Sequence, residues 1–264
     1  MTETKFATVA DVTLHYRVEG NPSGIPLVFI NSLGSDLRLW DALVSHFVDD
    51  YLIVRHDKRG HGLSDCPPAP YTIRDHANDV AHLLDYLKIN EAIIIGISVG
   101  GMIAQDFALH YPQRVKGLVL SDTGAKIGTD ELWNERIAVL REHGLAYLAE
   151  PILARWFAPS FSETHPAAYQ GYYNLLTRMP VEGYIGTCEA LRDCDLREVV
   201  GSITAKTLVL CGAEDLSTPP SLGQALAEQL SDARFAVIEG AAHLPCVEQP
   251  QAMAREMGAF LETL

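Results

Sequence analysis

The sequence has few basic residues: 20 Lys and Arg stand against 34 Asp and Glu, which gives a formal net charge of −14. Such a chain repels nucleic acid and anionic membrane surfaces, so we expect neither as a partner. It has no run of about 18 uninterrupted apolar residues, which excludes a transmembrane helix. Residues 1–10 lack the basic and apolar segments of a signal peptide, and we therefore expect a cytoplasmic protein.

Cysteine is also scarce, and no two cysteines form a Cys-x-x-Cys pair. The five are Cys66, Cys188, Cys194, Cys211 and Cys246. Their odd number and wide spacing argue against a disulfide framework, and we expect reduced, mostly buried thiols. The 264 residues, 48% of them apolar, are enough for one domain with a sizeable core and a small insertion.

Short apolar segments alternate with segments of helical periodicity over most of the chain. Strands are predicted over residues 5–10, 12–18, 26–30, 52–54, 92–95, 115–120, 207–211 and 233–238. Helices are predicted over residues 73–87, 102–111, 220–230 and 249–264, and after Asp36, whose carboxylate can cap a helix. Such alternation is typical of a parallel sheet covered by helices.

The pattern changes between residues 126 and 197, where no strand pattern occurs. Apolar residues recur there at helical spacing, and Pro151, Pro159, Pro166 and Pro180 punctuate the segment into four or so helices. We therefore divide the chain into an α/β core, residues 1–122 and 199–264, and an inserted helical lid, residues 123–198.

Ser98 lies between two glycines, Gly96 and Gly100, at Gly-x-Ser-x-Gly spacing. A predicted strand precedes it and a predicted helix follows, which is the context of a nucleophile elbow. The serine of such a turn is held in a strained conformation with positive φ, and its neighbours two residues away must lack side chains. Ser98 is therefore predicted to be a nucleophile; the alternative is a glycine-rich turn without chemistry.

A serine nucleophile needs a base, a group that orients the base and donors for the oxyanion. In parallel sheets these groups follow the carboxyl ends of strands. His243 follows the last predicted strand, and Glu214 and Asp215 follow the one before; we prefer Asp215 as the orienting acid. The amides of Val99, directly after the nucleophile, and of Leu33, after the strand over 26–30, are the predicted oxyanion donors.

His56 and His61 are close in the sequence and raise the question of a metal site. Their spacing and the intervening Arg59-Gly60 favour a hydrogen-bonded loop instead, and we predict no metal.

Ser98, Asp215 and His243 occur in the chain order of α/β hydrolases, and the whole sequence resembles that superfamily. Residues 57–64 (DKRGHGLS) are similar to a loop shared across it. Residues 31–40 (NSLGSDLRLW) resemble the corresponding run of the 3-oxoadipate enol-lactonases, as do lid residues 123–128, 133–137, 154–157 and 190–197. The resemblance implies a mostly parallel eight-stranded sheet flanked by helices, with a helical lid inserted.

The resemblance further implies hydrolysis of a small carboxylate-bearing lactone, 3-oxoadipate enol-lactone, without metal or organic cofactor. The substrate carboxylate needs a cation, and the guanidinium group offers two-point hydrogen bonding. Arg136 and Arg192 in the lid are the candidates, with Trp133 as a wall of the site. A solvated lid face, or an ion pair with a neighbouring acid, is the alternative for each arginine.

Other functions are compatible with the same residues. A carboxylesterase, or a hydrolase of carbon–carbon bonds in ring-cleavage products, uses the same three groups. A binding protein that senses a lactone and turns it over little is the alternative from another class. The sequence leaves the oligomeric state open and is compatible with a homo-oligomer.

Overall fold

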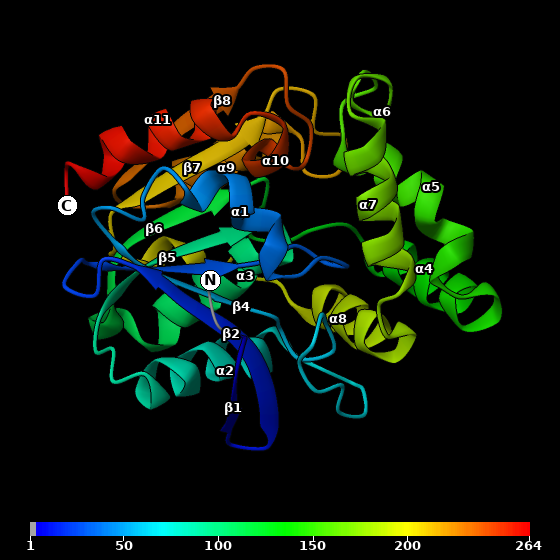
Figure 1. Ribbon diagram of the computed structural model, residues 1–264, viewed down its shortest axis with the longest axis horizontal. Helices are drawn as coiled ribbons and strands as arrows, with labels where there is room; N and C mark the ends of the chain where they lie inside the picture. The colour runs from blue at the N-terminus through cyan, green and yellow to red at the C-terminus, as the bar shows by residue number, and fades with distance from the viewer. Residues whose placement is uncertain (1–3) are drawn as a thin grey trace.

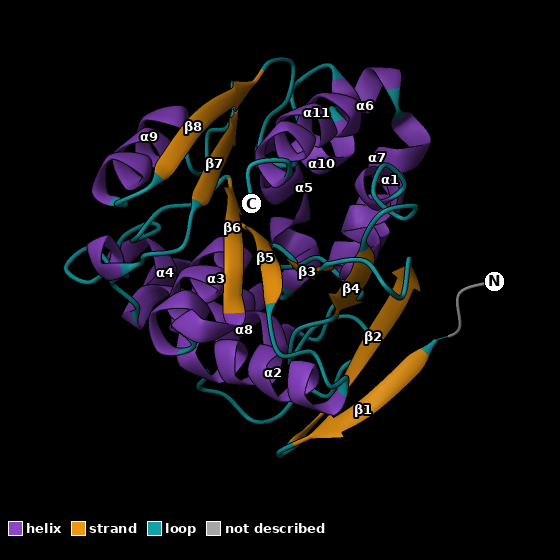
Figure 2. Ribbon diagram, turned by 90° about the vertical axis from the view of Figure 1, so that its left-hand side faces the viewer, coloured by secondary structure: helices purple, strands orange, loops and turns teal. Residues whose placement is uncertain are grey.

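The computed structural model describes residues 4–264, which form one eight-stranded sheet with helices on both faces (Figures 1 and 2). The strands are β1 (Lys5–Val9), β2 (Val12–Gly20), β3 (Pro26–Ile30), β4 (Leu52–His56), β5 (Ala92–Ile97), β6 (Val115–Ser121), β7 (Thr207–Gly212) and β8 (Ala233–Ile238). Their order is β1-β2-β4-β3-β5-β6-β7-β8, with β2 antiparallel to β1 and β4 and the remaining pairs parallel. The predicted α/β fold is thereby confirmed.

Helices cover the two faces of the sheet in separate groups. The core helices are α1 (Asp41–Val44), α2 (Ile73–Tyr86), α3 (Val99–His110), α9 (Pro220–Gln229), α10 (Pro245–Glu248) and α11 (Pro250–Leu261). Figure 2 shows α2, α3 and α9 on one face, and α1, α10 and α11 on the other. Short 3₁₀ turns occur at η1 (Leu37–Trp40), η2 (Pro112–Arg114) and η3 (Val200–Ser202). No helix of residues 4–264 is both long and apolar enough to span a membrane.

Five helices lie between β6 and β7 along the described chain. They are α4 (Asp130–His143), α5 (Leu145–Trp156), α6 (Phe161–Thr164), α7 (Pro166–Thr177) and α8 (Val181–Asp193). Figure 1 shows α4 to α7 grouped at one side of the core, with α8 beside α4. We expected Pro151 to separate two helices, but it lies inside α5. The buried face of α5, which includes Ile152 and Trp156, offsets the roughly 3 kcal/mol cost of a proline in a helix.

Two local differences from the sequence-based expectation bear on the site. The segment after Asp36 forms the 3₁₀ turn η1 and the short helix α1 instead of one continuous helix. Asp36 caps η1 as expected, because its carboxylate accepts the Arg38 amide at 3.0 Å. The helix after the elbow strand begins at Val99, immediately after Ser98, three residues earlier than its apolar periodicity indicated.

Parallel pairing brings the carboxyl ends of the central strands to one edge of the sheet. Gly96 pairs with Ile30 of β3, and Ile97 pairs with Ser121 of β6. The loops after β3, β5, β6, β7 and β8 therefore share this edge, as is usual for ligand sites of open parallel sheets. These loops carry the residues that we predicted from separate parts of the sequence.

Candidate active site

Ser98 occupies a tight turn between β5 and α3, with φ 59° and ψ −124°. Its amide donates to the Ser121 carbonyl at 3.0 Å, and its own carbonyl accepts the Thr123 hydroxyl at 2.7 Å. Neither flanking position has room for a side chain. A Cβ atom on Gly100, for example, would lie 2.1 Å from the Ile30 carbonyl oxygen. The strained turn with positive φ that the Gly-x-Ser-x-Gly spacing predicted is present.

His243 and Asp215 meet although they come from different loops, after β8 and β7. His243 Nδ1 lies 2.8 Å from Asp215 Oδ2, and both side chains are almost completely buried. The Asp215 carboxylate accepts the amides of Ser217 and Thr218 on Oδ1, at 2.7 and 3.0 Å. On Oδ2 it also accepts the Thr218 hydroxyl at 2.6 Å. The carboxylate therefore has two donors on each oxygen, which fixes its orientation toward the imidazole.

The ionised form of Asp215 is strongly favoured. Burial opposes it, but the charge of His243 and the hydrogen bonds from His243 and Thr218 outweigh that effect and lower the pKa of Asp215 to about 2. A carboxylate that remains charged next to an imidazole can stabilise the imidazolium form. Glu214, the alternative acid of the sequence analysis, has an exposed side chain.

The amides of Leu33 and Val99 have no hydrogen-bond acceptor within the part of the chain that the structure describes. The Asn31 side chain anchors the Leu33 loop by two hydrogen bonds. It donates to the His56 carbonyl at 2.7 Å and accepts from Trp40 Nε1 at 2.8 Å. Free backbone amides beside a reacting carbonyl are the donors that an oxyanion requires.

The loop over residues 56–61 supports the Leu33 loop. Lys58 Nζ donates to the Ser32 carbonyl at 2.9 Å, and His61 Nε2 accepts the Gly34 amide at 3.1 Å. Burial lowers the pKa of Lys58 to about 7 and that of His56 to about 4, and it also depresses the pKa of His61. His61 thus takes part in this hydrogen-bonded loop through its imidazole, whereas His56 does so through its backbone carbonyl.

The candidate nucleophile and the candidate base both line a small cavity of about 80 Å³. Ser98, His243 and Leu33 line it from the core, and Trp133 and Arg136 of α4 line it from the helical segment. The Arg136 guanidinium lies over the Trp133 ring, with Cζ 5.0 Å from the ring centroid. It forms no ion pair with an acidic side chain among residues 4–264, so its charge is available to a bound anion.

Arg192 does not line this cavity, contrary to our expectation. Its guanidinium lies in an exposed setting, where Nε binds Asp193 at 2.6 Å and Nη1 binds Asn134 at 3.1 Å. The rotation of α8 about its axis decides this direction, which helical spacing alone does not reveal. The structure shows the ion pair with Asp193, which was the alternative to a role in substrate binding.

Two residues at the site escaped the sequence analysis. Arg155 of α5 lines the cavity beside Trp156, and its Nη2 donates a long hydrogen bond of 3.5 Å to the Leu216 carbonyl. The signal in the sequence is that Arg155 is itself an arginine of the lid segment. Thr218 lies three residues after Asp215, and only the folded loop shows that its hydroxyl reaches the acid.

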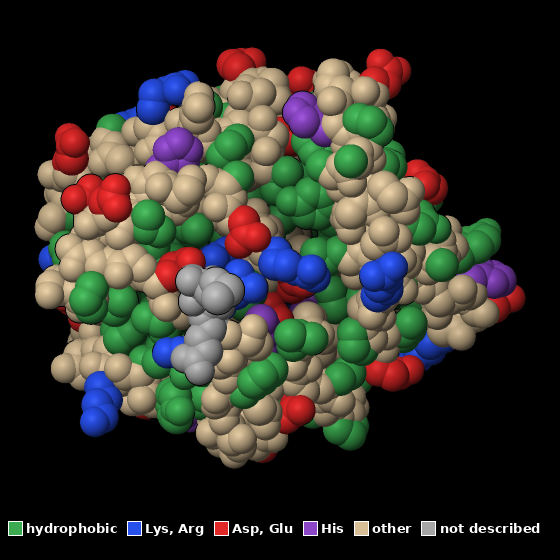
Figure 3. Space-filling view, viewed as in Figure 1, with side chains coloured by type: hydrophobic (Ala, Val, Ile, Leu, Met, Phe, Trp, Pro, Cys, Tyr) green, Lys and Arg blue, Asp and Glu red, His purple; other side chains and the backbone are tan. Residues whose placement is uncertain are grey.

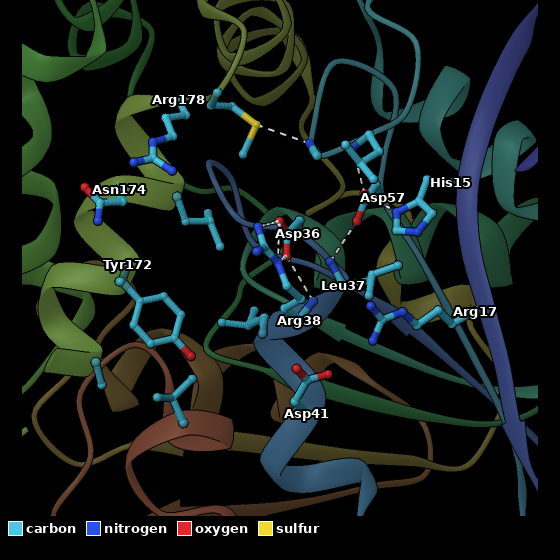
Figure 4. A pocket seen from close by; sticks show the side chains of 18 of the residues that line it. His15, Arg17, Asp36, Leu37, Arg38, Asp41, Asp57, Tyr172, Asn174 and Arg178 are labelled. Atoms are coloured by element: carbon cyan, nitrogen blue, oxygen red, sulfur yellow. Dashed lines mark hydrogen bonds and ion pairs between the residues drawn. The ribbon is translucent and has the colours of Figure 1, made fainter. Parts of the chain in front are cut away.

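A second and larger cavity, of about 720 Å³, lies between α7 and the segment that follows the Leu33 loop (Figure 4). Tyr172 and Asn174 approach it from α7 and Arg178 from the residue directly after that helix, and Arg38 approaches from the opposite side (Figure 4). Acidic and basic side chains lie close together on the face of the molecule seen in Figure 3. Ser98, Asp215 and His243 do not line this larger cavity, so we place the candidate site in the smaller one.

A mostly parallel sheet with helices on both faces, a strained serine elbow, and a buried acid–imidazole pair that follows the neighbouring strands define an α/β hydrolase. The chain belongs to this family: the profile of the alpha/beta hydrolase fold matches residues 25–250. It is 38% identical to 3-oxoadipate enol-lactonase 2 of Acinetobacter baylyi, over 97% of this chain and 95% of that protein.

Two further comparisons place the chain within the family. The crystal structure of the enol-lactonase from Burkholderia xenovorans LB400 superposes with a TM-score of 0.95 at 33% identity, covering 98% of this chain and 100% of that one. A RutD protein of Yersinia enterocolitica, to which carbamate hydrolysis is ascribed, is 30% identical over 87% of this chain and 85% of that protein.

Proposed function

We propose that the protein opens the ring of 3-oxoadipate enol-lactone to give 3-oxoadipate, as a cytoplasmic step of aromatic-compound catabolism. One observation carries the proposal: the candidate nucleophile Ser98, the candidate base His243 and the unpaired cation Arg136 line the same small cavity. A carboxylate-bearing lactone needs all three of these groups. Similarity to enol-lactonases over nearly the whole chain supports the same substrate class.

The reaction proceeds through an acyl-enzyme. Ser98 Oγ attacks the lactone carbonyl while His243 accepts its proton, and Asp215 stabilises the resulting imidazolium. The amides of Leu33 and Val99 hold the oxyanion, and loss of one such donor typically costs about 10²–10³ in rate. The ring C–O bond then breaks, His243 returns the proton to the departing enol oxygen, and the enol converts to the ketone. Water activated by His243 finally hydrolyses the ester on Ser98.

The substrate carboxylate is bound by Arg136, with Trp133 as an apolar wall. The guanidinium is stacked on the indole ring and has no acidic partner among residues 4–264, so it can offer two-point hydrogen bonding to a carboxylate. Arg155 of α5 contributes a second positive charge to the same cavity. These two arginines replace the pair Arg136 and Arg192 that the sequence suggested.

Carbamate hydrolysis is the second candidate, because of the similarity to the RutD protein. The same serine, imidazole and oxyanion donors serve acyl transfer from a carbamate, so the choice depends on the cation. A small uncharged carbamate or a simple carboxylester has no carboxylate that the Arg136 guanidinium could bind.

The decisive experiment is a spectrophotometric assay of the purified protein with freshly generated enol-lactone. We expect steady turnover by the wild type and by Ser45→Ala, a control at an exposed serine. We expect Ser98→Ala to lose about 10³–10⁶ in kcat.

Three outcomes contradict the proposal. Turnover by Ser98→Ala at the wild-type rate would remove Ser98 as the nucleophile. A single burst without further turnover would favour a sensing role. Faster hydrolysis of a simple carbamate or ester than of the enol-lactone would assign a different substrate.

A further inference from the structure

Asp122, which follows β6, is a carboxyl group that the proposed mechanism does not use. It is fully buried, and its backbone has φ 48°, a conformation that a residue with a side chain rarely adopts. Its neighbours hold the nucleophile turn, because Ser121 accepts the Ser98 amide and Thr123 donates to the Ser98 carbonyl. Strain of this kind persists where surrounding contacts enforce it, often at functional sites.

Asp122 also forms hydrogen bonds with β7, the strand that precedes the candidate acid Asp215. Its amide donates to the Leu210 carbonyl at 2.9 Å, and its Oδ1 accepts the Gly212 amide at 2.8 Å. Its Oδ2 lies 2.5 Å from the Ser121 hydroxyl. Asp122 thereby joins the end of β6, next to Ser98, to the end of β7, next to Asp215.

The carboxyl oxygens of Asp122 and Asp215 and the Cys211 sulfur all lie within 4.8 Å of one another. No Lys, Arg or His forms an ion pair with Asp122 among residues 4–264. Asp215 already has His243 as its partner, and the other titratable groups that face Asp122 are the thiols of Cys211 and Cys246. His243 is therefore the only cationic partner within reach of these two adjacent buried carboxyl groups among the described residues, and it is bound to Asp215. If both groups were ionised, at least one negative charge would be buried without a partner, which is strongly unfavourable.

We infer that Asp122 is a positioning residue that stays protonated and donates a hydrogen bond to the neighbouring Asp215 carboxylate. Burial first, and the charge of Asp215 second, raise the pKa of Asp122 well above its usual range, which agrees with this geometry. The donor restrains Asp215 without adding charge, so the carboxylate continues to face the imidazole. The inference rests on the proposed role of Ser98, Asp215 and His243, and it does not depend on which acyl compound is the substrate.

The test compares Asp122→Asn, which keeps a neutral donor and tolerates positive φ, with Asp122→Gly, which removes the side chain and relieves the backbone strain. We expect Asp122→Asn to keep kcat within about threefold of the wild type. We expect Asp122→Gly to lose about tenfold or more in kcat with KM little changed, since the role is exerted through Asp215. The rate at which a fluorophosphonate probe labels Ser98 should fall in the same ratio.

The pH profile gives a readout that a purely structural role would not move. A neutral Asp122 predicts the same midpoint for the acidic limb of kcat/KM in Asp122→Asn and in the wild type. An ionised Asp122 predicts a midpoint lower by about one pH unit or more in Asp122→Asn, because a negative charge near the imidazole has been removed. Asp79→Asn changes a buried aspartate that is bound to Arg59 and serves as the control. We expect it to lower the stability of the fold and to leave the midpoint of the pH profile unchanged.

Several results would overturn the inference. One is equal loss of activity in Asp122→Asn and Asp122→Gly, and another is a shifted acidic limb in Asp122→Asn. A third is a divalent metal that stays with the purified wild type and is lost in Asp122→Asn. If Asp122→Gly does not fold, the profile of Asp122→Asn decides alone. If the wild type ignores the enol-lactone but labels with the probe, the proposed substrate fails, while the labelling rates still test Asp122.

Discussion

A Cβ atom on Gly96 would lie 2.1 Å from the carbonyl oxygen of Gly100. The last residues of β5 and the first turn of α3 thus approach each other too closely for any side chain at this position. The contact is with the backbone and not with a flexible side chain, so it cannot be relieved by a change of rotamer. Glycine at position 96 is what permits the sharp turn that presents Ser98.

Gly96→Ala should lower the free energy of unfolding by about 2–3 kcal/mol through this overpacking. Gly258→Ala is the matched control, because no atom of residues 4–264 outside the backbone of α11 itself lies within 4 Å of its added Cβ. We expect the control to be neutral or stabilising by up to about 1 kcal/mol, since alanine favours the helix. Urea unfolding of both variants measures the difference, and equal stability of the two would contradict the steric argument.

Asp215→Asn should reduce kcat by about 10³–10⁴, because an amide no longer orients the imidazole or stabilises its charge. Glu214→Gln, one residue earlier and exposed, should leave kcat unchanged. Initial rates with the enol-lactone at saturating concentration give the comparison. A large loss in Glu214→Gln together with an active Asp215→Asn would show that the roles of the two acids are reversed.

Arg136→Ala should raise KM for the enol-lactone by about 10- to 100-fold, the value of a hydrogen-bonded charge pair in a buried site. Arg155→Ala should have a smaller effect in the same direction, and Arg192→Ala none, because Arg192 is bound to Asp193 outside the cavity. Steady-state kinetics of the three variants measure these effects. An unchanged KM in Arg136→Ala would remove that residue from the substrate site.

Lys58→Met should flatten the dependence of stability on pH between about 7 and 10. Burial lowers the pKa of Lys58 from 10.5 to about 7 in the folded chain, so the unfolded chain binds more protons in this range. Wild-type stability therefore gains up to about 1.4 kcal/mol per pH unit from this residue as the pH rises. Denaturant unfolding at several pH values compares the variant with Lys88→Met, at an exposed lysine. Parallel curves for all three proteins would show that Lys58 titrates normally.

The chemistry that depends on local backbone could be predicted from the sequence. The turn at Ser98 needs a strand, two glycines and a helix within about a dozen residues, and each of these leaves a pattern in a single stretch of chain. His243 and Asp215 were predictable because parallel strands bring their carboxyl ends to one edge of the sheet. The helix boundary at Val99 was misjudged because glycines interrupt the apolar periodicity there.

The contacts between distant segments were outside the reach of such patterns. Thr218 reaches Asp215 only through the turn that follows β7, and Asp122 lies near it because β6 and β7 are neighbours in the sheet. Pro151 lies inside α5 because burial of that helix outweighs the local preference of proline.

By itself, then, the sequence determined the strand–helix order, the serine turn and the loops that carry the candidate acid and base, because these follow from local backbone preferences and from the direction of parallel strands. Only the tertiary structure decided that Arg136 and Arg155 face Ser98 while Arg192 faces solvent. The rotation of each lid helix is set by packing against its neighbours, and helical periodicity carries too little information to fix which polar side chain points inward.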